Sequence, residues 1–152
     1  MSLDPVVIEK LEAYCAYQER CTQQVLDKLS KLDVPSARFD DHLHHLRTAG
    51  FLDDGRFAKA YASGRFNLKS WGPYRIRQGL KALRIPDHLI QGALSELEST
   101  ELEERLTRLL ERKMEQWSHL SKPAQRQRIV RSLTQKGYGM REVLDAWEAF
   151  CR

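Results

Sequence analysis

The sequence FLDDGRFAKAYASGRFNLKSWGPYRIRQGLKALRIPDHLIQGAL, residues 51–94, predicts three short helices with marked boundaries. Gly72-Pro73 begins the second helix, because proline fits the first helical position, where its missing N–H is not needed. Pro86 ends that helix, since the residue before a proline is forced out of the helical region. We therefore expect a three-helix unit here.

Asp53 and Asp54 precede the first of these helices and allow two interpretations. Two adjacent carboxylates could imitate a paired catalytic or metal-binding site. Their position just before a helix favours N-capping instead, since an aspartate side chain accepts hydrogen bonds from the free N–H groups there. We therefore expect both residues to stabilise the helix start.

The three-helix unit is repeated along the chain. Residues 25–43, 76–94 and 129–147 align without a gap, with matching apolar positions and a breaker after the third. A further helix is expected before each copy, over Val6 to about Gln18, Asp53 to about Phe66, and Glu101 to about Trp117. The matching apolar residues are Val25/Ile76/Ile129, Leu29/Leu80/Leu133, Val34/Ile85/Tyr138, Phe39/Ile90/Val143 and Leu43/Leu94/Trp147, and the breakers are Pro35/Pro86/Gly139.

This pattern predicts an all-α tandem array of three three-helix repeats, elongated and curved. The expected divisions are 1–51 for repeat one, 52–97 for repeat two and 98–152 for repeat three. Within repeats one and three, Thr22, Ser36 and Ser121 are expected to cap helices.

The composition of the 152 residues is that of a folded protein, with 41% hydrophobic residues and a mean hydropathy of −0.57. No apolar run approaches the roughly 20 residues that span a bilayer, and the N-terminus does not resemble a signal peptide. The three cysteines, Cys15, Cys21 and Cys151, lack metal spacing. We expect reduced thiols in a cytoplasmic protein without membrane contact.

Positive charge is concentrated in repeat two. Residues 55–92 hold eight Lys or Arg and one acid, a net charge of +7 in a chain of net charge +4. Arg77, Lys81 and Arg84 are spaced to share one helix face, a plausible strip for phosphate contacts, although charged faces often serve only solubility. Repeat three supplies secondary candidates. The candidate binding residues are Lys59, Arg65, Lys69, Arg75, Arg77, Lys81, Arg84, Arg126, Arg128 and Arg131.

Aromatic residues lie among these bases. Phe66, Trp71 and Tyr74 could stack on nucleotides, but packing in the core or between repeats is the favoured interpretation. Trp117 and Trp147 are expected in the core.

The sequence contains no pattern that indicates catalysis, a metal site or a cofactor. There is no phosphate-binding glycine loop with a lysine, no His-Glu-x-x-His and no nucleophile elbow. His42 and His45 share a helix face, but no third ligand lies near them in sequence, and we expect His42, His44 and His45 to be solvent-exposed. We therefore expect neither an enzyme nor a metal- or cofactor-binding protein.

Residues 51–94 resemble the core of the RecX regulatory proteins, a family built from tandem three-helix repeats. The resemblance is specific over about 45 residues and looser in repeats one and three. Gly79 stands where the family usually has an acid, and Arg84 where it usually has a glycine. The residues that carry the resemblance are Leu52, Asp53, Asp54, Arg56, Phe57, Ala58, Arg65, Gly72, Pro73, Arg75, Ile76 and Leu80.

The resemblance implies a non-enzymatic modulator that binds the filament of the recombinase RecA on single-stranded DNA. It implies inhibition of ATP hydrolysis, of strand exchange and of the co-protease function in the SOS response, and thus a role in DNA repair and recombination. Single-stranded DNA is expected to bind weakly or through the filament, and the chain is expected to be a monomer. Two alternatives stay open, a DNA-binding helical module without a protein partner and a helical-repeat scaffold.

Overall fold

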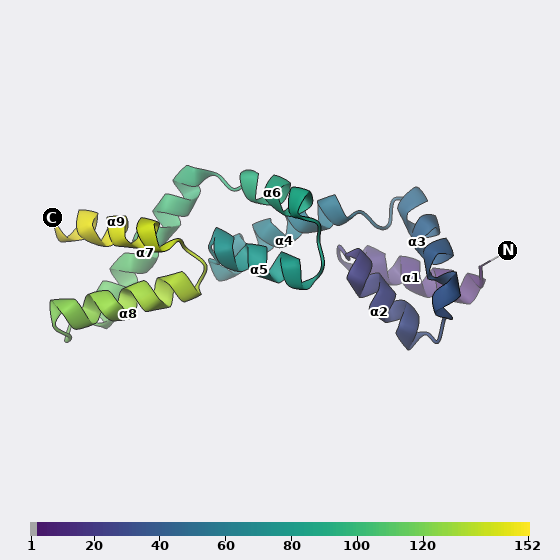
Figure 1. Ribbon diagram of the computed structural model, residues 1–152, viewed down its shortest axis with the longest axis horizontal. Helices are drawn as coiled ribbons and strands as arrows, with labels where there is room; N and C mark the ends of the chain where they lie inside the picture. Colours follow the sequence, from purple (N-terminus) through teal and green to yellow (C-terminus); the bar gives the residue numbers. More distant parts are fainter. Residues whose placement is uncertain (1–2) are drawn as a thin grey trace.

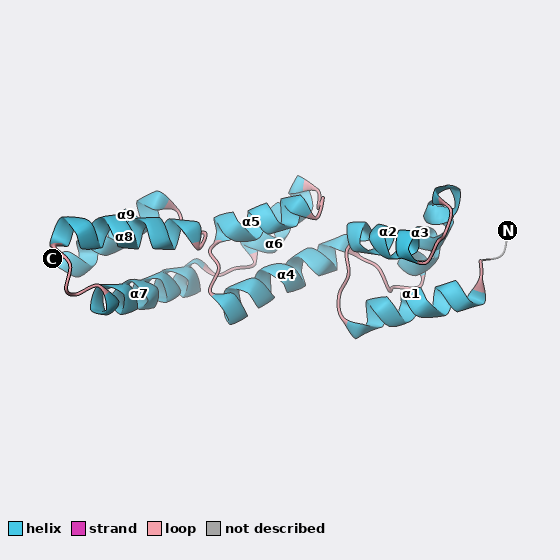
Figure 2. Cartoon of the chain, turned by 90° about the horizontal axis from the view of Figure 1, so that it is seen from below, coloured by secondary structure: helices cyan, strands magenta, loops and turns pink. Residues whose placement is uncertain are grey.

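The computed structural model describes residues 3–152, which form nine α-helices and one short 3-10 turn and contain no strand. Figure 1 shows the helices arranged in three groups along one long axis, with the chain termini at opposite ends. Viewed from below, each group is again separate from the next (Figure 2). The predicted all-α tandem array of three-helix repeats is confirmed.

Each repeat has its own hydrophobic core. The first is built by α1 (Pro5–Tyr17), α2 (Thr22–Lys31), the 3-10 turn (Ser36–Arg38) and α3 (Phe39–Thr48). The second is built by α4 (Asp54–Lys69), α5 (Pro73–Ala82) and α6 (Asp87–Ser95). The third is built by α7 (Ser99–Gln116), α8 (Lys122–Gln135) and α9 (Met140–Cys151).

The matching apolar positions form these cores. Val25, Ile76 and Ile129 are each fully buried. Leu29, Leu80 and Leu133, one helical turn later, are fully buried as well. Burying one such side chain stabilises the fold by about 1.5–3 kcal/mol. The aromatic residues follow the favoured interpretation in part: Phe66 and Trp147 are buried and Trp117 and Trp71 half-buried, whereas Tyr74 is 60% exposed.

The middle helix of every repeat ends in a left-handed residue. Asp33, Arg84 and Gly137 have φ values of 59°, 59° and 109°. The next residue's N–H reaches back to the last turn, as in Ile85 N–H to Leu80 O at 3.1 Å. This Schellman arrangement favours glycine, which stands only in the third repeat. Its consequence for the predicted cationic strip is that α5 ends at Ala82, so Arg84 lies beyond the helix.

Side chains join repeats one and two. The Asp54 carboxylate accepts hydrogen bonds from the Thr22 N–H and from the Thr22 hydroxyl, each at 2.8 Å. Arg56 donates to both Glu19 carboxylate oxygens at 2.8 and 2.9 Å. Cys21, at the start of α2, packs into the core of repeat two. This joint therefore combines charged and polar contacts with one buried side chain.

Backbone atoms join repeats two and three. The Gly72 N–H donates to Lys136 O, and the Tyr74 N–H donates to Gly137 O, both at 2.9 Å. A Cβ on Gly72 would overlap the backbone of Gly137, and a Cβ on Gly137 would lie 2.7 Å from Arg75 N. Only glycine at both positions permits this approach.

Three local predictions were wrong. Asp53 caps its own helix through the Arg56 N–H at 3.0 Å and Asp54 lies in the first turn of α4, both as expected. Thr22, however, follows the N-cap position of α2, which Cys21 occupies, and its N–H donates to Asp54. Ser36 starts the 3-10 turn without a side-chain cap. His42 is 3% exposed because its Nδ1 pairs with Arg38 O at 2.7 Å. Ser121 caps α8 through the Ala124 N–H, as expected.

Candidate functional site

Trp71 is the centre of a group of cations in repeat two. The guanidinium carbons of Arg75 and Arg65 lie 4.3 and 5.2 Å from the centroid of the Trp71 ring, and Lys69 Nζ lies 5.7 Å from it. These distances are within the range of cation–π attraction. We call Trp71, Arg65, Lys69 and Arg75 the Trp71 cluster. It brings together three of the predicted binding residues from two helices.

The local sequence explains why these residues meet. Helix α4 ends at Lys69, and Ser70 adopts a left-handed conformation with φ 56°. Gly72 and Pro73 then begin α5 at once. Trp71 therefore lies in a tight corner, with the last turn of α4 on one side and the first turn of α5 on the other.

Side chains of repeat three form hydrogen bonds to this corner. Arg105 of α7 donates to Phe66 O at 2.9 Å and to the Ser70 hydroxyl at 2.8 Å. The Tyr138 hydroxyl donates to Ser70 O at 2.9 Å. Burial raises the pKa of Tyr138 to about 12, although the charge of Arg105 opposes the shift. The hydroxyl therefore stays protonated and holds the left-handed Ser70 in place.

Lys136 lies near Arg75 of the Trp71 cluster, and its charged form is disfavoured there. Burial lowers its pKa, and the charges of Lys113 and Arg75 lower it further. A bound anion would relieve this crowding, because it would add an opposite charge to three neighbouring cations.

The remaining predicted residues of repeat two lie apart from the cluster. Lys59 forms an exposed ion pair with Glu96 at 3.2 Å, and Arg77 donates to the Gln91 side chain at 3.2 Å. Lys81 and Arg84 are exposed, with no carboxylate partner among the described residues. Only Arg77 and Lys81 share the α5 face, so the predicted strip of three cations on one helix is wrong in its third member.

In repeat three, Arg126, Arg128 and Arg131 are exposed on α8. Arg128 lies 5.9 Å and Lys113 lies 5.1 Å from the Trp117 ring centroid. Trp117 therefore has the same kind of cationic neighbours as Trp71. The structure thus places a tryptophan next to cations in each of these two repeats.

The sequence interpretation missed Arg105, Lys113 and Lys136. Arg105 lies in an acidic stretch, and its role appears only when α7 packs against the end of α4. Lys136 follows the end of α8, and nothing local distinguishes it from a solvated lysine. The tandem repeat offered no signal either, because the equivalent residues of repeats two and one are Leu83 and Leu32.

The chemistry of this surface is that of binding. Cations carried on aromatic rings suit phosphate groups and stacked bases. No group of three or more potential metal ligands occurs within residues 3–152. None of the helices in that range is both long and apolar enough to cross a membrane.

These features define a tandem three-helix repeat protein with a cationic, tryptophan-centred surface at the joint between its second and third repeats. The second three-helix domain of RecX matches residues 53–94, and the third matches residues 101–147. The chain therefore belongs to the RecX family.

Curated relatives agree with this assignment. The Regulatory protein RecX of Bacillus licheniformis is 32% identical over 125 residues, which are 82% of this chain and 48% of that protein. The same-named protein of Bacillus pumilus is 29% identical over 133 residues, 87% of this chain and 50% of that protein. The chain thus spans about half the length of these relatives, which are named as regulatory proteins.

Solved structures share the fold. The crystal structure of RecX from Lactobacillus salivarius aligns with a TM-score of 0.86 at 24% identity, over 94% of this chain and 93% of that one. A second structure, of regulatory protein RecX, aligns with a TM-score of 0.81 at 23% identity, over 95% and 79% of the two chains.

Proposed function

We propose that this chain is a non-enzymatic regulator that binds the RecA–single-stranded DNA filament. It inhibits ATP hydrolysis, strand exchange and the co-protease activity of the filament, and so dampens recombination, DNA repair and the SOS response in the cytoplasm. The division into repeats 1–51, 52–97 and 98–152 is part of this proposal. Membership of the RecX family is one support.

The Trp71 cluster is the observation that carries the proposal. Arg65, Lys69 and Arg75 have no carboxylate partner among residues 3–152, so they are available to an external anion. The backbone hydrogen bonds between repeats two and three bring Lys136 of repeat three next to these residues. An elongated array offers a long binding surface. A filament of protein and DNA presents both carboxylates and phosphates to such a surface.

The test is the ATPase rate of the cognate RecA on single-stranded DNA, with this protein titrated in at physiological salt. We expect a fall in rate at substoichiometric ratios. Neutralising Arg65, Lys69 and Arg75 to glutamine together should raise the inhibitory concentration at least tenfold. A control with the same change in charge replaces Arg108, Arg112 and Arg141, which are exposed on α7 and α9. Unchanged inhibition by the cluster variant would reject these residues as anchors.

Direct binding to naked single-stranded DNA is the second candidate. The aromatic–cation pairs at Trp71 and Trp117 favour it, since stacking on aromatic rings beside cations is the usual mode of single-strand binding. It predicts tight binding to poly(dT) at physiological salt without RecA. Neutralising three phosphate contacts would then reduce the slope of log affinity against log salt by about 2.

A further inference from the structure

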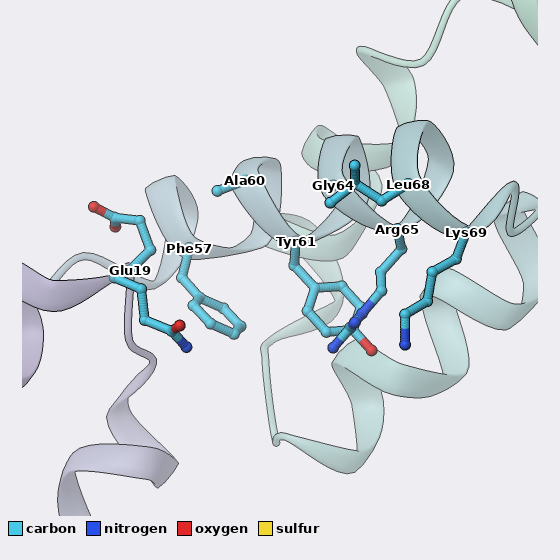
Figure 3. Close-up of a pocket in the computed structure, with 9 residues that line it drawn as sticks. Glu19, Phe57, Ala60, Tyr61, Gly64, Arg65, Leu68 and Lys69 are labelled. Atoms are coloured by element: carbon cyan, nitrogen blue, oxygen red, sulfur yellow. The ribbon is translucent and has the colours of Figure 1, made fainter.

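A groove of about 440 Å³ runs along α4, where repeat one meets repeat two. Phe57, Tyr61, Arg65 and Lys69 recur every four residues and project from one side of the helix (Figure 3). The distance from Phe57 to Lys69 along the helix axis is about 18 Å. The groove is therefore long enough for a short helical or extended peptide segment.

Gly64 is in the middle of this groove and has no structural explanation within the chain. A Cβ at Gly64 would have nothing within 4 Å, as at Gly92 of α6, but Gly64 lines the groove and Gly92 does not. By contrast, a Cβ at Gly79 would overlap the hydroxyl of Tyr61, which explains that glycine. Glycine inside a helix lowers stability relative to alanine. We infer that Gly64 leaves room for an occupant that the chain itself does not supply.

The neighbouring side chains are apolar. Ala60 and Leu68 lie one turn before and one turn after Gly64, and Leu68 is 87% exposed. A leucine held this far into water next to an open groove presents an aliphatic contact surface. The half-buried ring of Tyr61 extends that surface, whereas Phe57 is 5% exposed and belongs to the core of repeat two.

The two ends of the groove differ in charge. At the α1 side, Glu19 lies in the groove wall and is paired with Arg56. At the other end are Arg65 and Lys69, which have no carboxylate partner among the described residues. The matching ligand carries an apolar side chain at its centre and a carboxylate at the end that meets Arg65 and Lys69.

We propose that this groove docks a segment of a RecA protomer in the filament, with an apolar side chain over Gly64 and a carboxylate on Arg65 and Lys69. This inference rests on the proposed function. A protein segment fits better than a DNA strand, because Ala60 and Leu68 offer aliphatic contacts and the cations without a carboxylate partner in the described part of the chain lie at one end of the groove only. The apolar wall of the groove thus contributes contacts to protein, in addition to the anion contacts of the Trp71 cluster, to which Arg65 and Lys69 also belong.

The experiment compares Gly64→Gln with Gly92→Gln. Gly92 is an exposed helical glycine of α6 whose Cβ would also have nothing within 4 Å, so both variants keep the fold and gain the same side chain. Leu68→Ser is a third variant that shortens the apolar contact. A dye on the exposed Cys151 reports binding by anisotropy, to the cognate RecA filament on poly(dT) and to naked poly(dT).

We expect Gly64→Gln and Leu68→Ser to weaken filament binding at least tenfold, while Gly92→Gln binds like the wild type and naked poly(dT) binding does not change. An equal loss of affinity for naked poly(dT) would assign the groove to nucleic acid and overturn the proposal. Wild-type filament affinity in Gly64→Gln would overturn it while the proposed function stands. Failure of the wild type to bind the filament would overturn both.

Discussion

The carboxylate of Asp54 in α4 caps the first turn of α2 by binding both the N–H and the hydroxyl of Thr22, 32 residues earlier in the chain. Its neighbour Asp53 caps α4 itself. Two adjacent aspartates therefore serve two different repeats. One sets a helix boundary and the other holds the repeats together.

Replacing Asp54 with alanine should loosen this joint. Hydrogen bonds to a charged group contribute about 1.5–3 kcal/mol, so the free energy of unfolding should fall by about 2 kcal/mol. The amide of Thr22 should also lose protection from hydrogen exchange. Asp53→Ala is the control, because it should cost about 1 kcal/mol as a lost N-cap and leave the Thr22 amide protected. Equal protection of Thr22 in both variants would contradict this role.

Replacing Arg84 with glycine should stabilise the protein. A left-handed conformation costs an ordinary residue about 1–2 kcal/mol, and the greater freedom of glycine in the unfolded chain offsets part of the gain. We expect an increase of about 0.5–1 kcal/mol in the free energy of unfolding, measured in urea. Gly137→Ala at the equivalent position should be destabilising, because its Cβ would meet Arg75. A lower urea midpoint for Arg84→Gly would refute the strain at this position.

Tyr138 should make stability depend on alkaline pH. Its pKa is raised to about 12 from the ordinary value of 10.0, so the protonated hydroxyl is favoured in the folded state. The resulting stabilisation is complete below pH 10 and is lost as pH rises from about 10 to 12. Tyr138→Phe should lose about 1 kcal/mol at pH 7, with the hydrogen bond to Ser70, and should lack this alkaline component. Parallel losses in both proteins across that range would show that Tyr138 titrates normally.

Lys136 should favour binding at the expense of stability. Its pKa is lowered, so the charged form is disfavoured in the folded state at neutral pH. Lys136→Gln should therefore raise the free energy of unfolding at pH 7 by a few tenths of a kcal/mol, about the size of an exposed charge effect. This gain should shrink as pH approaches 10.5, the ordinary pKa of a lysine, because the wild-type lysine then loses its charge. A gain that is unchanged between pH 7 and pH 10 would have another cause.

The three thiols should differ in reactivity. Burial is the main cause that raises the pKa of Cys15 and Cys21, which keeps both thiols protonated and inaccessible. Cys151 is exposed near the C-terminus. A thiol reagent should therefore modify one cysteine rapidly in the native protein and all three in denaturant. Cys151→Ser should remove the rapid phase, and its persistence would mean that a buried thiol is accessible.

The helices and repeats could be predicted from sequence because both are local. Gly72-Pro73, Pro86 and the recurring apolar positions mark helix boundaries and buried faces without knowledge of the partners. The joints could not be predicted in this way. Asp54 has the sequence context of an N-cap, and only the packing of repeat one shows that Thr22 receives its carboxylate.

The charge composition pointed to the repeat that holds the candidate site, but the sequence identified only some of the residues that meet there. Charge counts identified repeat two, and Arg65, Lys69 and Arg75 do meet around Trp71. Arg84 was misplaced because the end of α5 depends on a left-handed residue that is not glycine. Arg105 and Lys136 were missed because they reach the site from another repeat.

The two joints give the molecule two different mechanical properties. Between repeats two and three the backbones touch directly, and the side chains of Arg105 and Tyr138 add hydrogen bonds to the end of α4 and to Ser70. Between repeats one and two, Asp54 binds Thr22 and Arg56 pairs with Glu19, and this ion pair weakens as ionic strength rises. If the two ends of the molecule were pulled apart, we expect the contacts between repeats one and two, including Asp54 with Thr22, to break first. Repeats two and three would stay together as one unit, and the ease with which repeat one separates from them would increase with salt concentration.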